Sequence, residues 1–192
     1  MKKLTVLLFV LTTFASAQLR VGLDLSRTGK ASYSVPNDVK AMLALMGEEI
    51  PGTENITAKG IGLNIGYEFM LLSLVGVGAE MNLPLGEECG NDDDKCYEPD
   101  TQFFGYGVAK FPVFPMVRGV VKGGLVMSTE KDVDAGLGLG FGLRVKPPIL
   151  PVGVEASYNI YNLSRKQDFE GMGSIDMDLR QGYFNLSATY SF

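Results

Sequence analysis

The sequence of 192 residues contains no histidine and no tryptophan, and its only cysteines are Cys89 and Cys96. The lack of histidine removes the commonest general base and the commonest metal ligand from the chemistry open to the chain. The net charge of −5 argues against a nucleic-acid partner, because such partners require a basic surface. Beyond the N-terminus, no segment approaches the roughly 20 apolar residues of a transmembrane helix. These absences disfavour enzymes that use histidine, nucleic-acid binders and helical membrane proteins.

The N-terminus has the three parts of a secretory signal peptide. Residues 1–3 are a positive n-region, residues 4–14 are an apolar h-region, and Ala15-Ser16-Ala17 is a small-residue cleavage site. The apolar run is too short to cross a membrane as a helix. We therefore expect residues 1–17 to be a cleaved signal peptide. Residues 18–192 then form one exported domain, either soluble in the periplasm or inserted as a barrel in the bacterial outer membrane.

The mature chain alternates between apolar residues and polar or small ones, which is the period of a β-strand. At the C-terminus the alternation runs without a break up to Phe192, the last residue. Eight alternating segments can be drawn, at about 18–27, 57–69, 73–85, 101–111, 116–128, 133–145, 151–162 and 177–192. Short connectors follow the second, fourth and sixth segments, and most of the others are long. Short turns at one end and long loops at the other are typical of outer-membrane β-barrels.

Glycine explains how such a barrel would be filled. One face of most segments is bulky and apolar, whereas the other is rich in glycine and carries a few long charged side chains. An eight-stranded barrel is just wide enough inside for side chains to fill it, so small residues would let charged ones cross the lumen. Buried charges must be paired. We therefore expect a mixed interior network of Glu68, Glu80, Glu155, Arg118, Lys122 and Arg144.

The bulky face should then meet lipid. For segment 101–111 this rule predicts that Phe104, Tyr106 and Val108 point outward, although Lys110 interrupts the pattern. Without tryptophan, tyrosine and phenylalanine would have to form the aromatic girdles at the membrane interfaces. The girdle candidates are Tyr67, Phe69, Phe104, Tyr106, Tyr158, Tyr190 and Phe192.

This architecture and the terminal Tyr190-Ser191-Phe192 resemble the small eight-stranded outer-membrane barrels of bacteria, the OmpA-transmembrane-domain and OmpX-like class. The resemblance implies an all-β, antiparallel, up-and-down transmembrane barrel of eight strands that follows the signal peptide. It also implies that Tyr190 and Phe192 form an assembly signal for the barrel assembly machinery, and that the barrel is a monomer among outer-membrane lipid and lipopolysaccharide.

The connectors hold the other candidate sites. The segment Gly86–Asp100 has a net charge of −6 and contains both cysteines, which we expect to form a disulfide in an exported loop. Inside it, Asp92, Asp93 and Asp94 either form a solvated loop tip or contact a cation, through Ca²⁺ binding or bridging to lipopolysaccharide phosphates. The stripe of apolar residues in Asn37–Gly47 predicts a short helix that packs on the barrel rim, docks a partner or lies on the membrane surface.

Three functions remain open on this evidence. The first is a non-enzymatic outer-membrane barrel with a structural or surface-interaction role through its long loops, for an extracellular ligand that the sequence does not identify. The second is a narrow porin-like channel, and the third is a soluble exported β-barrel binding protein. Glu80 and Glu155 could serve as an acid–base pair but are better explained as interior ion pairs, and we expect no catalytic site, cofactor or resident metal. Mixed-sign charges in so narrow a lumen favour a plugged barrel over a pore.

Overall fold

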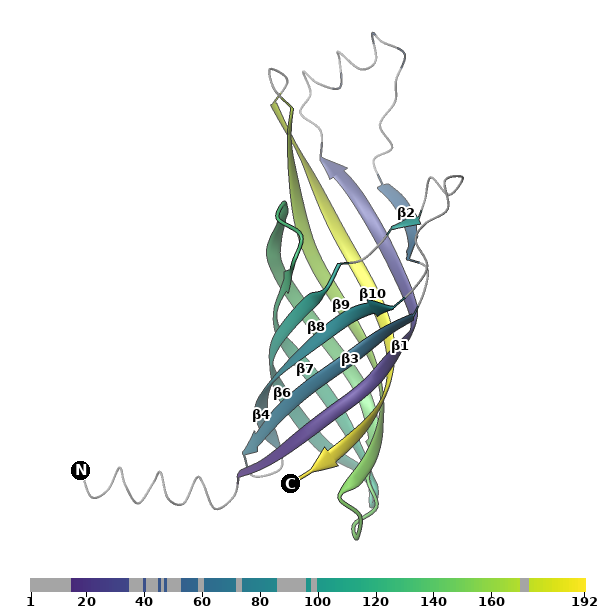
Figure 1. Cartoon of the computed structure of the whole chain (residues 1–192), viewed down its shortest axis with the longest axis vertical. Helices are drawn as coiled ribbons and strands as arrows, with labels where there is room; N and C mark the ends of the chain where they lie inside the picture. The colour runs from purple at the N-terminus through teal and green to yellow at the C-terminus, as the bar shows by residue number, and fades with distance from the viewer. Residues whose placement is uncertain are drawn as a thin grey trace, which may run out of the picture.

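A computed structural model describes residues 15–34, 40, 45, 47, 53–58, 61–71, 74–85, 96–97, 100–169 and 173–192 (Figure 1). Ten strands lie in these segments: β1 Ala15–Ser34, β2 Thr53–Ala58, β3 Ile61–Leu71, β4 Val75–Leu85, β5 Cys96–Tyr97, β6 Gln102–Phe114, β7 Val117–Ser128, β8 Val133–Val145, β9 Val152–Phe169 and β10 Gly173–Ser191. Eight of them wrap into a barrel, and β2 and β5 add to its upper edge beside β1.

The barrel is closed and antiparallel. Each of its strands pairs with its neighbours in the chain, in the order β1, β3, β4, β6, β7, β8, β9, β10. The first strand then pairs with the last, from Gln18 opposite Ser191 to Ser34 opposite Asp176. This closure leaves no free sheet edge within the barrel wall, which is the condition for a sheet to cross lipid. The predicted all-β barrel of eight antiparallel strands is confirmed.

The outer surface is apolar around the whole barrel. Leu19, Tyr67, Val77, Phe141 and Leu186 all point outward and are between 38% and 62% exposed. On β3 every outward side chain is apolar over its 11 residues, which matches the length of a transmembrane β-strand. Such a surface requires lipid as its solvent, so the barrel is transmembrane. No helix among the described residues is long and apolar enough to cross a membrane.

The two ends of the barrel differ. We call the end with the short turns after β3, β6 and β8 the turn end; it also holds the C-terminus (Figure 1). At the opposite, loop end, β1, β9 and β10 extend beyond the other strands. There the outward side chains become polar, at Lys30, Asn162 and Arg180. This change marks where the wall leaves the membrane and enters water.

Two of the expected loops are therefore shorter than predicted. Strand pairing continues from the membrane to Ser34 on β1 and to Phe169 opposite Gly173 between β9 and β10, through residues assigned to loops. The strands continue because they share a small apolar core above the membrane. Ala31, Leu163 and Leu179 point inward there and are at most 3% exposed. These three residues come from β1, β9 and β10. The core that they form is therefore only weakly indicated by the alternation within any one segment.

Strand β6 faces the opposite way from the prediction. Phe104, Tyr106 and Val108 are at most 4% exposed and lie inside the barrel, so Phe104 and Tyr106 take no part in a girdle. The reason is space left by glycines on other strands. A Cβ on Gly78 would lie 2.7 Å from the Tyr106 ring, and one on Gly138 would lie 2.5 Å from the Phe104 ring. The large side chains of Phe104 and Tyr106 fill the parts of the lumen where other strands carry glycine.

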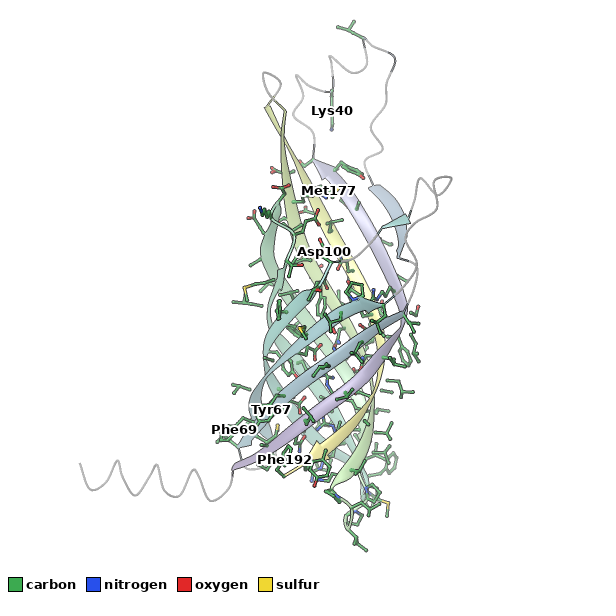
Figure 2. All side chains as sticks on the ribbon, in the orientation of Figure 1. Lys40, Tyr67, Phe69, Asp100, Met177 and Phe192 are labelled. Carbon is green, nitrogen blue, oxygen red and sulfur yellow. The ribbon has the colours of Figure 1, made fainter. Side chains whose placement is uncertain are left out.

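The other girdle candidates lie on the outside. Tyr67, Phe69, Tyr190 and Phe192 are between 42% and 71% exposed, and Tyr158 is half-buried. Figure 2 places Tyr67, Phe69 and Phe192 in the lower part of the barrel, near the turn end. Tyr190 and Phe192 also stack edge to face, with ring centroids 4.9 Å apart. These rings lie at the level expected for an interfacial aromatic belt.

Candidate functional site

The polar inner face of the barrel carries a cluster of buried charges, which we call the lumen network: Arg20, Glu68, Glu80, Lys110, Lys122, Arg144 and Glu155. The seven residues come from seven different strands, one each from β1, β3, β4, β6, β7, β8 and β9, and none is more than 3% exposed. Alternation alone directs these side chains inward, since their neighbours in sequence face lipid. Closure of the barrel then brings together residues up to 135 positions apart.

Glu155 on β9 lies at the centre of the network. Its Oε1 accepts hydrogen bonds from Arg20 Nη1 at 2.7 Å and from Lys122 Nζ at 3.0 Å. Its Oε2 accepts a hydrogen bond from Arg144 Nε at 2.8 Å. One carboxylate thus holds three cations from β1, β7 and β8. Charge-assisted hydrogen bonds of this kind are about twice as strong as neutral ones.

The other two carboxylates complete the network. Glu68 Oε2 lies 2.5 Å from Lys110 Nζ and 3.1 Å from Arg144 Nη2. Glu80 forms an ion pair with Arg20, and its Oε1 accepts a hydrogen bond from the Tyr161 hydroxyl at 2.9 Å. Arg144 and Arg20 therefore each bridge two carboxylates. The seven groups form one connected set rather than separate pairs.

The network has four cations and three carboxylates, which gives it a net charge of +1. The Gln18 side chain stabilises two of the four cations. Its Oε1 accepts a hydrogen bond from Lys110 Nζ at 2.6 Å and another from Arg144. Opposite charges lie in contact across the lumen instead of forming a ring of one sign. Each carboxylate of the network is therefore in contact with at least one cation of the protein.

Aromatic rings fill the lumen above the charges. The Phe104 ring lies 4.8 Å from the Tyr106 ring and 5.2 Å from the Tyr161 ring, measured between centroids. The Tyr183 ring follows at 5.2 Å from Tyr161, and the Arg27 guanidinium stands 5.6 Å above its centroid. From the turn end upward, the lumen therefore passes from the lumen network to a level of aromatic rings and then to the apolar core at the loop end. At the aromatic level Arg27 also forms a buried ion pair with Asp24 at 3.6 Å.

The structure brings together five of the six charges expected inside the barrel, namely Glu68, Glu80, Glu155, Lys122 and Arg144. Arg118, the sixth, differs from the prediction, because its side chain is exposed at the turn end. It has the right alternation but lies below the level of the lumen network, close to where β7 begins.

Sequence reasoning missed two members of the network. Arg20 alternates with Leu19 and Val21 on β1, so the same pattern that located the glutamates could have located it. Lys110 lies on the same face of β6 as Phe104, Tyr106 and Val108, so the outward prediction for those three residues leaves it out of the network. The lysine itself was the available signal, since a charge on a lipid-facing strand costs a few kcal/mol.

The loop candidates lie mostly outside the described residues. Cys89 and Asp92, Asp93 and Asp94 are among those not described, so the disulfide and the cation contacts stay predictions. The same holds for most of the helix predicted in Asn37–Gly47 and for residues 1–14 of the signal peptide. Among the residues that the structure does describe, no group of three or more histidine, cysteine or acidic side chains could hold a metal ion.

One ion pair lies at the described loop end. Glu130, in the turn between β7 and β8, is 2.9 Å from Arg165 on β9, and both side chains are partly exposed. Partial burial raises the pKa of the Glu130 carboxyl, although Arg165 opposes the change. This pair is partly exposed to solvent, whereas the ion pairs of the lumen network are buried.

Comparison with known proteins supports the fold. No protein-family model matches the chain. No curated protein matches it either. Among solved structures, the outer membrane protein OprG of Pseudomonas aeruginosa is similar, with a TM-score of 0.50 and 10% identity over 93% of this chain and 96% of that one.

Two further solved structures are similar over nearly the whole chain. The attachment invasion locus protein Ail of Yersinia pestis has a TM-score of 0.46 and 14% identity, and the alignment covers 93% of this chain and 99% of that one. The outer membrane protease OmpT of Escherichia coli has a TM-score of 0.45 and 10% identity, with 92% and 97% covered. At 10% identity the similarity to OprG shows the fold alone and leaves the activity open.

Proposed function

We propose that this chain is a plugged, non-enzymatic barrel of the bacterial outer membrane that acts through its loop end, in a structural or surface-interaction role. The observation that carries the proposal is the lumen network. Glu155 alone contacts Arg20, Lys122 and Arg144 at full burial, which supports a lumen that is filled by charge pairs at this level. A barrel without an open lumen has only its outer wall and its two ends with which to act.

The apolar wall and the closed sheet together support a location in the outer membrane. The wall can face lipid, and closure leaves no strand edge with unpaired backbone groups in the bilayer. The loop end supports the surface role. Loops that differ in length from the turns and project into water are where binding residues usually lie on a rigid scaffold. Segment Gly86–Asp100, with its net charge of −6, is the strongest candidate, through divalent cations that bridge it to lipopolysaccharide phosphates or through an unidentified ligand.

Single-protein recordings in a planar lipid bilayer test the plug. The unmodified protein should give no conductance, or only small irregular events, because no charged group of the network is free to bind a passing ion. A Glu155→Ala variant loses the central carboxylate and should leak more often. A steady, ion-selective conductance in the unmodified protein would contradict the plugged barrel and favour the narrow channel.

Fractionation tests the location. We expect the mature protein to fractionate with the outer membrane and to migrate as a folded barrel in SDS unless it is boiled. Recovery in the soluble periplasmic fraction would instead support the exported binding protein. The absence of catalysis is part of the same proposal, and hydrolysis of a peptide or lipid substrate by the purified barrel would contradict it.

A further inference from the structure

Two hairpin ends at the turn end expose large apolar side chains. We call them the turn platform: residues 111–118, which comprise the end of β6, its turn and the start of β7, and residues 145–151, from the last residue of β8 to the start of β9. Phe114 and Met116 are 68% and 50% exposed, and Ile149 and Leu150 are 90% and 55% exposed. The turn between β8 and β9, drawn in green, projects furthest past the C-terminus (Figure 1).

The platform is rigid and continuous with the lipid-facing wall. Five of the nine prolines of the chain lie in its two turns, and proline fixes the backbone angle φ. The backbone amide of Lys146 donates to the carbonyl of Met116 at 2.9 Å, which joins the two turns. Phe111 and Val145, the first residues of the two segments, are 49% and 46% exposed and continue the apolar wall into the platform.

The charge of the platform has a single sign. Neither turn contains an aspartate or a glutamate, whereas each carries one cation, Arg118 or Lys146. The Lys146 ammonium donates to Ser191 Oγ at 2.7 Å, which fixes it at the rim of the barrel. Burial and the nearby Arg118 and Arg144 lower the pKa of Lys146, so this rim favours the approach of a negative group.

We infer that the turn platform binds an anionic phospholipid of the membrane leaflet that surrounds the turn end. In outer-membrane barrels the short turns face the periplasm, so this is the periplasmic leaflet. Phe114, Ile149 and Leu150 would enter the boundary between headgroups and acyl chains, and Arg118 and Lys146 would contact the phosphate. The apolar side chains of the platform suit the acyl chains at this boundary, and its two cations suit the anionic headgroups.

The lack of tryptophan in the chain allows a direct test. In an Ile149→Trp variant the new indole is the only one, so its fluorescence reports on the platform alone. The folded protein is placed in phosphatidylcholine vesicles that contain either brominated phosphatidylcholine or brominated phosphatidylglycerol. We expect blue-shifted emission that both lipids quench, and a relative binding constant roughly fivefold or more in favour of phosphatidylglycerol at low salt.

Charge variants in the same background test the headgroup contact. Arg118→Gln with Lys146→Gln should bring the relative binding constant close to one. The matched control, Lys131→Gln with Arg180→Gln, removes the same charge from exposed positions at the loop end and should keep the preference. Migration of unheated protein in SDS shows that each variant is folded. Emission at the wavelength of a solvated indole, or equal quenching by the two lipids in the unmodified charge background, would overturn the inference.

Discussion

Replacing Glu155 by glutamine should be among the most destabilising conservative changes in the barrel. The substitution keeps the size of the side chain but removes the charge that faces Arg20, Lys122 and Arg144. The lumen network then holds four cations and two carboxylates, so its net charge rises from +1 to +2. Breaking a buried ion pair by removing one partner costs about 3–5 kcal/mol, since it leaves an uncompensated buried charge. We expect a loss in that range.

The effect is measured by urea unfolding of the barrel in lipid vesicles, with the folded fraction read from its migration in SDS without heating. Glu130→Gln is the matched control, because it removes the same charge from an ion pair that is partly exposed. Exposed pairs contribute about 0–1 kcal/mol, so the control should unfold close to the unmodified protein. Both variants have the same change in composition, and only burial separates them.

A second substitution distinguishes charge from packing. Lys122→Met in the Glu155→Gln background removes one cation and returns the network to a net charge of +1, and it should recover part of the lost stability. Coupling of this kind is expected between residues of one network. Equal stability of the Glu155→Gln and Glu130→Gln variants would refute the reasoning. It would mean that the lumen is hydrated enough to screen its charges.

Three further predictions concern other parts of the chain. Deleting Phe192, or replacing it by aspartate, should block insertion into the outer membrane but not export, and normal levels of the inserted variant would contradict the assembly role of the terminal aromatic. Cys89 and Cys96 should resist thiol labelling before reduction, and the Cys→Ser pair should still fold, because closing so short a loop contributes roughly 2–3 kcal/mol and acts locally. Gly138→Val should destabilise the barrel by about 1–3 kcal/mol or more, since its Cβ would lie 2.5 Å from a buried ring. Gly105→Val, whose Cβ meets nothing within 4 Å, should unfold near the unmodified protein, and equal effects would contradict the packing argument.

The interior glutamates show which features of the lumen the alternation of apolar and polar residues can predict. Glu68, Glu80 and Glu155 each stand opposite a lipid-facing neighbour on their own strand, and that local fact sufficed to place them in the lumen. Which cation each would contact did not follow from the sequence. Arg144 lies directly opposite Glu155 on the neighbouring strand β8, but Arg20 and Lys122 reach Glu155 from strands that are not its neighbours, so these contacts depend on closure of the barrel.

The sequence by itself determined that the chain is a closed barrel of eight strands with an apolar wall, because a period of two repeats locally in every segment. Only the tertiary structure decided which face of β6 turns inward, since the answer depends on Gly78 and Gly138 on other strands. It also decided how far the strands extend above the membrane and that Arg118 lies outside the network. These outcomes depend on the volume of the lumen and on pairing across the barrel, and no single segment contains that information.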